Sequence, residues 1–240
     1  MKNKFLEFKS VCYNAENLEM FQNNGKREEF NRKNSIYYAN EFPVDVLFIG
    51  DSITESFEVQ PYFGELGSIV NRGIGGEAVE GLSKRFDLDV VMLKPKVCVL
   101  SEGINNSYEL YQQYAKGVEI TDGMIDSLIL QMLPHYAEMI EKCLCANIRL
   151  IISSVLPLGV YDFRNKFILK LNSELEKLCK KKGVLYVDTY SALTEPDGVL
   201  MKDYTFGDKL HPHVLGYNVL AKTLKPYIKK EIEKYSTEIS

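Results

Sequence analysis

The chain has 240 residues, of which 29 are lysine or arginine and 33 are aspartate or glutamate, so its formal net charge is −4. This length is enough for one large α/β domain with a substantial core. A slightly acidic chain lacks the basic surface that attracts nucleic acid or an anionic membrane, and we expect neither as a partner.

Targeting segments and metal sites are not expected either. Residues 1–10 are polar and charged, and no stretch reaches the ~20 apolar residues of a membrane-spanning helix, which predicts a cytoplasmic protein without a membrane span. The five cysteines are odd in number and fit reduced thiols. Cys143-Leu144-Cys145 lacks the spacing of a zinc site, and the chain has three histidines, so we expect no metal.

The N-terminal part differs from the rest of the chain. Residues 1–44 are polar and aromatic by turns, and Asn23-Asn24-Gly25 separates two expected helices. The segment ends at Phe42-Pro43, which suits the start of a strand. We interpret residues 1–44 as a helical extension packed on a main domain of residues 45–240.

From Val46 onward, expected strands and helices alternate. The strands are expected at Val46–Ile49, Ser68–Asn71, Val97–Leu100, Ile148–Val155 and Val184–Val187. The helices are expected within Glu55–Leu66 and over Glu77–Leu93, Met124–Ala146, Arg164–Lys182 and Pro212–Lys234. This alternation predicts an α/β fold with three layers, a doubly wound sheet of about five parallel strands between helices.

A serine follows the first expected strand directly. The apolar run Val46–Ile49 stops at Gly50-Asp51-Ser52, and a helix can start from Thr54. A serine at such a turn stands at the carboxyl edge of the sheet, near helix N–H groups that favour negative charge. Ser52 is therefore a candidate nucleophile, and the alternative is an ordinary turn in which Ser or Thr caps the helix.

The glycine-rich turn Gly73-Ile74-Gly75-Gly76 has two interpretations. A dinucleotide-binding turn normally follows the first strand and has an acidic residue ~20 positions later, whereas this turn follows the second strand and has Ala78 at the sixth position. We favour the other interpretation, in which glycine exposes a backbone N–H to an anion, and we expect no cofactor.

The third expected strand leads into Gly103-Ile104-Asn105-Asn106 at the same edge. Asparagine beside glycine is commonly a turn residue. It can also donate a side-chain amide hydrogen to an oxyanion. Candidate residues then follow three strands and converge at one place.

Near the C-terminus, Asp208 precedes His211 by three residues. In a loop, this carboxylate can accept the imidazole Nδ1–H and leave Nε2 free as a base. Taken singly, Asp208 can be a turn former and His211 a helix-start residue. With Ser52 they supply a nucleophile, a base and an orienting carboxylate in the order Ser, Asp, His.

Together, these motifs resemble those of the SGNH or GDSL-type esterases and acylhydrolases, from about Val46 to the last helix. The resemblance implies the flavodoxin-like fold of that family. It also implies a catalytic serine, aspartate and histidine at Ser52, Asp208 and His211. The implied oxyanion donors are the N–H groups of Ser52 and Gly76 and the amide of Asn105.

The remaining motif positions have supporting roles by the same resemblance, namely Asp51, Asn71 and Gly103. Asn106 departs from the family, where most members have Asp. The branch that resembles intracellular platelet-activating-factor acetylhydrolase catalytic subunits also has Asn-Asn there, so the departure indicates a branch and does not argue against activity.

The segment from Asn106 to Asp122 is longer than the ~2–6 residues that a connection between a strand and a helix needs. Tyr108, Tyr111 and Tyr114 recur at a spacing of three, which puts them along one side of a helix. They can pack as the edge of a surface helix. Alternatively, Asn106, Tyr108 and Tyr111 line a substrate pocket that favours a short acyl group.

These observations predict a serine esterase that hydrolyses a small-molecule ester with a short, acetyl-like acyl group through an acyl-enzyme. Alternatives with the same chemistry are a thioesterase, a lysophospholipase and a carbohydrate acetylesterase, because fold and catalytic residues do not specify substrate. A non-catalytic ligand-binding member of the fold is an alternative of another class. A homodimer is compatible with the sequence, which does not decide the oligomeric state.

Overall fold

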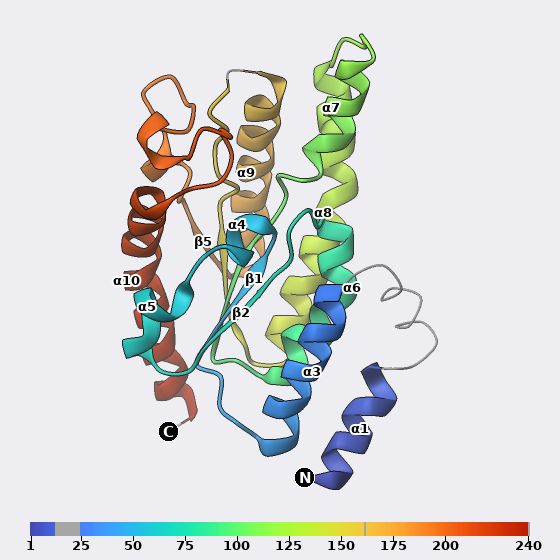
Figure 1. The fold of residues 1–240 in the computed structure, drawn as a ribbon, viewed down its shortest axis with the longest axis vertical. Coiled ribbons are helices and arrows are strands. Elements are labelled where there is room, and N and C mark those ends of the chain that lie inside the picture. The colour runs from blue at the N-terminus through green and yellow to red at the C-terminus, as the bar shows by residue number, and fades with distance from the viewer. Residues whose placement is uncertain (13–24, 161, 240) are drawn as a thin grey trace.

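The computed structural model describes residues 1–12, 25–160 and 162–239 (Figure 1). Within these residues, five parallel strands form one sheet: β1 (Val46–Gly50), β2 (Ile69–Gly73), β3 (Val97–Ser101), β4 (Arg149–Ser153) and β5 (Leu185–Val187).

The described helices are α1 (Lys2–Cys12), α3 (Gly25–Asn40), α4 (Ser52–Glu55), α5 (Val59–Phe63), α6 (Val79–Asp89), α7 (Ser107–Ala115), α8 (Asp122–Cys145), α9 (Phe163–Lys182) and α10 (Val214–Ile239). Short 3₁₀ turns accompany them: η1 (Gly64–Leu66), η2 (Val91–Leu93), η3 (Ser191–Leu193) and η4 (Lys202–Tyr204).

The strand order is β2-β1-β3-β4-β5, which confirms the expected doubly wound α/β fold. From β1 the chain first moves to β2 on one side. It then crosses back past β1 to β3, β4 and β5 on the other side. The carboxyl ends of β1 and β3 therefore flank the point where the winding reverses, which is where open α/β sheets bind ligands. Ser52 follows β1 and Asn105 follows β3, so both candidate residues start from this point.

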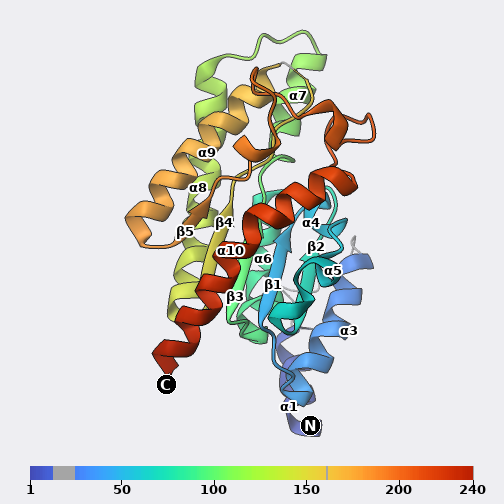
Figure 2. The same ribbon diagram turned by 90° about the vertical axis from the view of Figure 1, so that its left-hand side faces the viewer.

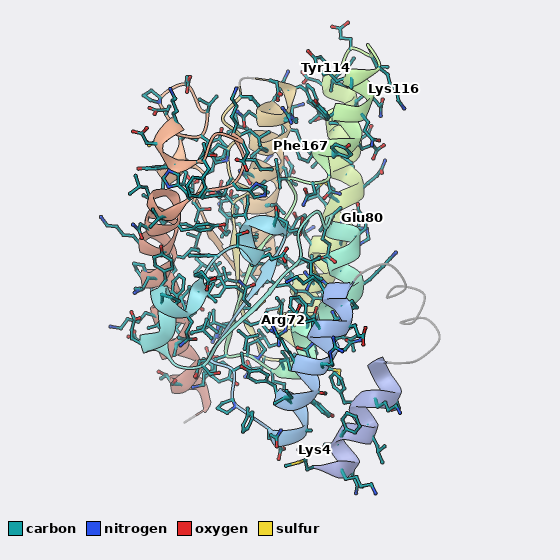
Figure 3. All side chains as sticks on the ribbon, in the orientation of Figure 1. Lys4, Arg72, Glu80, Tyr114, Lys116 and Phe167 are labelled. Atoms are coloured by element: carbon teal, nitrogen blue, oxygen red, sulfur yellow. The ribbon has the colours of Figure 1, made fainter. Side chains whose placement is uncertain are left out.

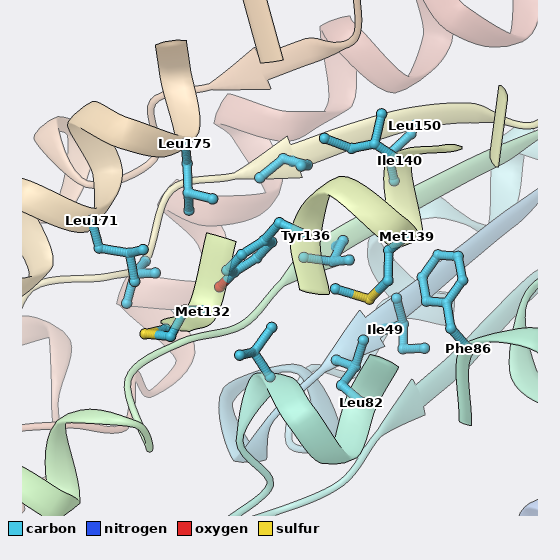
Figure 4. Packing of buried hydrophobic residues seen from close by; sticks show 14 of the residues in the cluster. Ile49, Leu82, Phe86, Met132, Tyr136, Met139, Ile140, Leu150, Leu171 and Leu175 are labelled. Carbon is cyan, nitrogen blue, oxygen red and sulfur yellow. The ribbon is translucent and has the colours of Figure 1, made fainter. Parts of the chain in front are cut away.

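Helices cover the two faces of the sheet (Figures 1 and 2). Leu47 and Ile49 of β1 point to one face, in a core cluster with residues of α6, α8 and α9. Figure 4 shows that cluster around Tyr136 and Met139. Val46 and Phe48 point to the opposite face, where α5 and α10 cover them. Because β1 is buried on both faces, its sequence is a continuous apolar run.

The helix after β1 starts earlier and ends sooner than expected. α4 begins at Ser52, not at Thr54, because the Asp51 side chain accepts the Ile53 N–H at 2.9 Å and caps the helix. The single helix expected within residues 55–66 is broken. The Asn71 amide donates to the carbonyl oxygens of Thr54 and Phe57, at 2.7 and 3.0 Å, which an uninterrupted helix would use itself.

The last helix starts later than expected, at Val214 and not at Pro212. Pro212 pairs with Thr205 in an antiparallel bridge, and the His213 N–H donates to the Tyr204 carbonyl oxygen at 2.8 Å. These contacts hold the backbone before α10 in an extended loop. The loop carries His211, so its geometry affects the candidate site directly.

The N-terminal helix α3 packs on α6 through buried polar groups. Arg27 forms a bidentate ion pair with Asp89, and the Asn34 amide donates to Asp89 at 2.6 Å. Arg72 of β2 lies against α3, with its guanidinium 5.0 Å from the centre of the Phe30 ring (Figure 3). The division between an extension of residues 1–44 and a domain of residues 45–240 stays a prediction, and Asn23-Asn24 lies outside the described residues.

Two expectations about the chain as a whole concern the thiols and the membrane. In the described part of the chain, Cys98, Cys143 and Cys179 are buried free thiols and Cys145 is an exposed one. No helix in that part has both the length and the apolar character needed to cross a bilayer.

Candidate active site

Ser52, His211 and Asp208 lie in one hydrogen-bonded chain, although 159 positions separate Ser52 from His211. The Ser52 Oγ lies 2.8 Å from the His211 Nε2, and the His211 Nδ1 lies 2.7 Å from the Asp208 Oδ2. With Asp208 ionised, Nδ1 carries the proton and donates to the carboxylate. Nε2 is then an acceptor for the Ser52 hydroxyl, the arrangement that a general base requires.

The loop before α10 holds the Asp208 carboxylate by several donors. Its Oδ1 accepts the N–H groups of Leu210 and His211 and the Thr205 hydroxyl, each at 2.9 Å. Partial burial opposes ionisation. The hydrogen bonds from the Leu210 N–H, the His211 ring and N–H and the Thr205 hydroxyl nevertheless hold the Asp208 pKa well below its usual range. Asp208 is therefore a fixed negative charge beside the imidazole.

The turn that presents Ser52 depends on close contact between two strands. A Cβ on Gly50 would lie 1.9 Å from the Ser101 carbonyl oxygen, so only glycine allows the ends of β1 and β3 to approach this closely. Asp51 comes next and is buried. Burial raises the Asp51 pKa to about 6, and the hydrogen bond from the Ile53 N–H opposes that rise only in part.

The backbone N–H groups of Ser52 and Gly76 are free to bind an anion. Gly76 has a φ of +75°, a left-handed conformation that favours glycine. Among the described residues, neither its N–H nor that of Ser52 has a hydrogen-bond acceptor. The Asn105 amide donates one hydrogen bond to the Glu77 carbonyl oxygen at 2.8 Å, and it has a second hydrogen to donate.

The residues expected in supporting roles contact the same region. Asn71 Oδ1 accepts the Gly73 N–H at 2.8 Å, so Asn71 joins β2 to the residues that follow α4. Gly103 has a φ of +131°, and a Cβ there would lie 2.9 Å from the hydroxyl of Tyr136. A larger residue at position 103 would therefore displace the segment that carries Asn105.

A pocket of about 350 Å³ adjoins Gly76 and Asn105. Tyr108 and Tyr111 of α7 line it together with Arg164, whose guanidinium lies 4.8 Å from the centre of the Tyr111 ring. Tyr114 lies further along α7 (Figure 3). Its ring packs on the ring of Phe163.

Asn106 does not line this pocket, contrary to the expectation. Its side chain is buried and turned to the start of α6, where it accepts the Val79 N–H at 3.1 Å and donates to the Glu80 carboxylate. The Val79 N–H is one of the free donors of the first turn of α6, so Asn106 caps that helix from another segment.

Three further residues hold the site and were not identified from the sequence. Glu55 accepts the Gly75 N–H at 2.6 Å, and Glu77 accepts the Arg85 Nε at 2.6 Å. Arg85 also donates to the Gly50 carbonyl oxygen at 3.3 Å. The sequence signal that could have identified Arg85 is its spacing, since Arg85 and Asp89 each follow an apolar residue of α6 by three positions. Both side chains are buried in the structure.

Glu102 is a buried carboxyl behind the site. Its Oε1 accepts the Gly103 N–H, while its Oε2 has no partner among the described residues. Burial, and then the nearby charges of Asp51 and Glu77, raise the Glu102 pKa well above its ordinary value. Burial therefore favours the neutral form of this carboxyl group. The described residues contain no group of three or more His, Cys, Asp or Glu side chains able to hold a metal ion.

Comparison with known proteins identifies the relatives of this fold. The profile of the GDSL-like Lipase/Acylhydrolase family matches residues 48–219, well over half of the chain. The matched range includes Ser52, Asn105, Asp208 and His211.

Individual relatives are more distant. An acetylxylan esterase of Geobacillus stearothermophilus is 26% identical over 206 residues, which cover 74% of this chain and 90% of that protein. The platelet-activating factor acetylhydrolase IB subunit alpha2 of Homo sapiens is 28% identical over 201 residues, covering 81% and 80%. A crystal structure of a GDSL-like lipase of Bacteroides thetaiotaomicron has a TM-score of 0.65 and 26% identity, covering 85% and 97%.

Proposed function

Because the chain belongs to the GDSL-like Lipase/Acylhydrolase family of carboxylic ester hydrolases, we propose that it is a serine esterase that uses Ser52, His211 and Asp208. The observation that carries this proposal is the continuous hydrogen-bonded chain from Asp208 through His211 to Ser52, with distances of 2.7 and 2.8 Å. A structural hydroxyl would need no such alignment with an oriented imidazole.

The first half of the reaction forms an acyl-enzyme. The Ser52 Oγ attacks the ester carbonyl carbon while His211 Nε2 takes the hydroxyl proton. Negative charge develops on the carbonyl oxygen, and the N–H groups of Ser52 and Gly76 and the second amide hydrogen of Asn105 are the proposed donors. The bond from carbon to the alcohol oxygen then breaks, and His211 gives its proton to the leaving alcohol.

The second half of the reaction releases the acid. Water enters, His211 removes a proton from it, and the resulting hydroxide attacks the acyl carbon. The bond from that carbon to the Ser52 Oγ then breaks, and His211 returns its proton to the Ser52 oxygen. The Asp208 carboxylate holds the imidazole in the productive tautomer and stabilises its protonated form in both halves. No metal or organic cofactor takes part in these steps.

The preferred substrate in this proposal has a short acyl group. Tyr108 and Tyr111 form an aromatic wall of the pocket beside Gly76 and Asn105, and we propose that this wall restricts the acyl chain. A cytoplasmic location and a homodimer remain predictions that this proposal does not need.

Acetylated carbohydrate is a second candidate substrate, and a specific observation favours it. The Tyr108 and Tyr111 rings are stacked, with 6.1 Å between their centres, and both side chains are exposed. Exposed aromatic rings offer apolar faces on which the C–H groups of a sugar ring can pack. A relative that is named an acetylxylan esterase supports the same candidate.

A stopped-flow burst with p-nitrophenyl acetate tests the esterase proposal. The wild type should release a burst of p-nitrophenol that matches the enzyme concentration, followed by slower turnover. Ser52→Ala should lose both phases and keep its thermal unfolding profile. Ser173→Ala, which changes an exposed serine of α9, is the matched control and should retain both. Turnover at the wild-type rate in Ser52→Ala would contradict the mechanism.

The carbohydrate candidate needs a separate comparison. Acetate release from acetylated xylo-oligosaccharides and from p-nitrophenyl acetate should be measured with the same enzyme. A kcat/KM that is higher for the oligosaccharide, and lowered by Tyr111→Ala for that substrate alone, would support it. Equal losses for both substrates would favour a simple short-chain ester.

A further inference from the structure

The segment from Gly73 to Glu77, here the oxyanion loop, is held by side chains from outside it. On one side of Gly76, the Gly75 N–H donates to Glu55 Oε2 at 2.6 Å. On the other side, the Glu77 carboxylate accepts Arg85 and the Glu77 carbonyl oxygen accepts Asn105. The proposed oxyanion donor therefore lies between two anchored neighbours.

The anchor at Gly75 matters because the loop contains two adjacent glycines. Glycine has more backbone freedom than any other residue, so the Gly75–Gly76 peptide has no local preference that would fix its orientation. The Gly76 N–H belongs to that peptide. A hydrogen bond on Gly75 removes much of the freedom and leaves the Gly76 N–H directed to one place. Gly75 is also next to the nucleophile, since a Cβ there would lie 3.6 Å from the Ser52 Cβ.

Glu55 joins three parts of the molecule. It ends α4, the helix that begins at Ser52, and its Oε2 holds the oxyanion loop. Its Oε1 lies 3.0 Å from the Lys26 Nζ on α3, which precedes the sheet in sequence. The charge on Lys26 keeps the carboxylate oriented between α3 and Gly75.

A second connection reaches α3 from the opposite side of the loop. Arg85 pairs with Glu77 and also with Asp89, which accepts Arg27 of α3. Both neighbours of Gly76 are thus connected to α3. Two side chains make the connection from Gly75, and three make it from the Glu77 carboxylate.

We propose that Glu55 is a positioning residue that holds the Gly75–Gly76 peptide with its N–H directed at the oxyanion, and that α3 supports turnover through Lys26. This inference rests on the proposed esterase function. It assigns no contact between Glu55 and the substrate. The effect of Glu55 is carried by the Gly75 N–H alone.

Steady-state kinetics with p-nitrophenyl acetate test the inference. Glu55→Ala should lower kcat by about 10- to 100-fold and change KM little, because a misplaced donor affects mainly the transition state. Glu55→Gln should retain most of the activity, since its amide oxygen still accepts the Gly75 N–H. Lys26→Met should lose less than Glu55→Ala, because the acceptor itself remains.

Glu58→Ala is the matched control. It removes the same charge from an exposed position three residues away and should behave as the wild type. If Glu55→Ala unfolds at a lower temperature than the wild type, Glu55→Met repeats the test with a side chain of similar length and no acceptor.

A boronic acid inhibitor gives a readout that a merely structural role would not change. Phenylboronic acid forms a tetrahedral anion on a reactive serine and places an oxygen where the oxyanion develops. Its affinity should fall in Glu55→Ala by about the same factor as kcat and should recover in Glu55→Gln.

The outcomes separate the two proposals. A wild-type burst together with unchanged kcat and boronate affinity in Glu55→Ala overturns the role of Glu55 and leaves the esterase proposal intact. Equal losses in Glu55→Ala and Glu55→Gln also overturn it, because the acceptor would then not be what matters. A wild type without any burst overturns the esterase proposal, and this inference with it.

Discussion

The Asn105 side chain donates to the Glu77 carbonyl oxygen at 2.8 Å, which joins the segment after β3 to the oxyanion loop after β2. One amide hydrogen is used in this bond, and the other is the proposed oxyanion donor. Asn105→Ala should lower kcat by ~10²–10³ with a smaller change in KM, because the lost donor acts on charge that develops in the transition state. Steady-state kinetics with p-nitrophenyl acetate measure both constants.

A change confined to KM would identify Asn105 as a ground-state substrate contact instead. Asn40→Ala changes an asparagine at the end of α3 and provides the control for the chemistry of the substitution.

Asp208→Asn tests whether a negative charge is needed beside the imidazole. The amide oxygen can still accept the N–H groups of Leu210 and His211, so the loop should keep its shape. The amide no longer stabilises a protonated imidazole, and kcat/KM should fall by about 10²–10⁴ across the pH range. A pH profile of kcat/KM on both proteins measures this. Wild-type activity in the variant would remove Asp208 from the mechanism.

Asp51 should make the protein less stable as the pH rises through the weakly acidic range. Burial raises its pKa to about 6, so the folded chain binds this proton more tightly than the unfolded chain, in which an aspartate has a pKa of ~3.9. Its contribution to stability is therefore fully present below pH ~3.9 and is lost as the pH approaches about 6. The difference of about two between these pKa values corresponds to about 3 kcal/mol.

The substitution Asp51→Asn should remove that dependence, since asparagine remains a good N-cap for α4. Urea denaturation at several pH values from about 4 to 7 would compare the free energies of unfolding. The wild type should lose stability relative to the variant as the pH rises. Parallel curves would mean that Asp51 titrates normally. Asp203→Asn, at an exposed position, is the control.

Breaking a buried ion pair at α6 should lower the free energy of unfolding far more than breaking an exposed ion pair on α3. Asp89 is fully buried and pairs with Arg27 and Arg85, so Asp89→Ala would leave two buried guanidinium groups without their shared carboxylate. We expect a loss of about 3–5 kcal/mol in the free energy of unfolding. Glu28→Ala breaks the exposed pair with Arg32 and should change it little. Urea denaturation of both variants measures the contrast, and similar losses would contradict it.

The α7 tyrosines should set acyl-chain selectivity. Replacing Tyr108 and Tyr111 together by alanine opens one wall of the pocket beside Asn105, so the preference among p-nitrophenyl esters should move to longer chains while the Ser52 burst persists. Tyr114→Ala removes a tyrosine that packs on Phe163 and should leave the profile unchanged. An unchanged profile in the double variant would give the two tyrosines a packing role only.

Sequence patterns were sufficient for the sheet and for the residues at its carboxyl edge. Strands β1, β3 and β4 each have a dense apolar run, and Ser52 and Asn105 come soon after the runs of β1 and β3. The helix ends were less predictable. The break after Glu55 depends on the amide of Asn71, which comes from another strand. No local pattern near Glu55 records that contact.

The residues that hold the oxyanion loop were out of reach for the same reason. Glu55 and Arg85 are ordinary charged residues in their own helices, and their importance comes from partners at Gly75 and Glu77. Asn106 illustrates the opposite error. Asn106 was expected in the pocket because it is next to Asn105 in the motif. The start of α6 lies close to Asn106, however, and the Val79 N–H donates to the Asn106 side chain. The burial of helix ends is decided by tertiary packing and not by spacing.

His211 and Ser52 belong to parts of the molecule that differ in local stability. Ser52 follows a central strand buried on both faces, whereas Asp208 and His211 lie in a loop whose neighbour Phe206 is 86% exposed. Segments with few buried apolar contacts open locally at a much lower free energy than the whole fold. Heating should therefore abolish catalysis before the sheet unfolds, and amide protons of residues 205–211 should exchange faster with solvent than those of β1. The enzyme would then lose its activity at a lower temperature than the one at which it denatures.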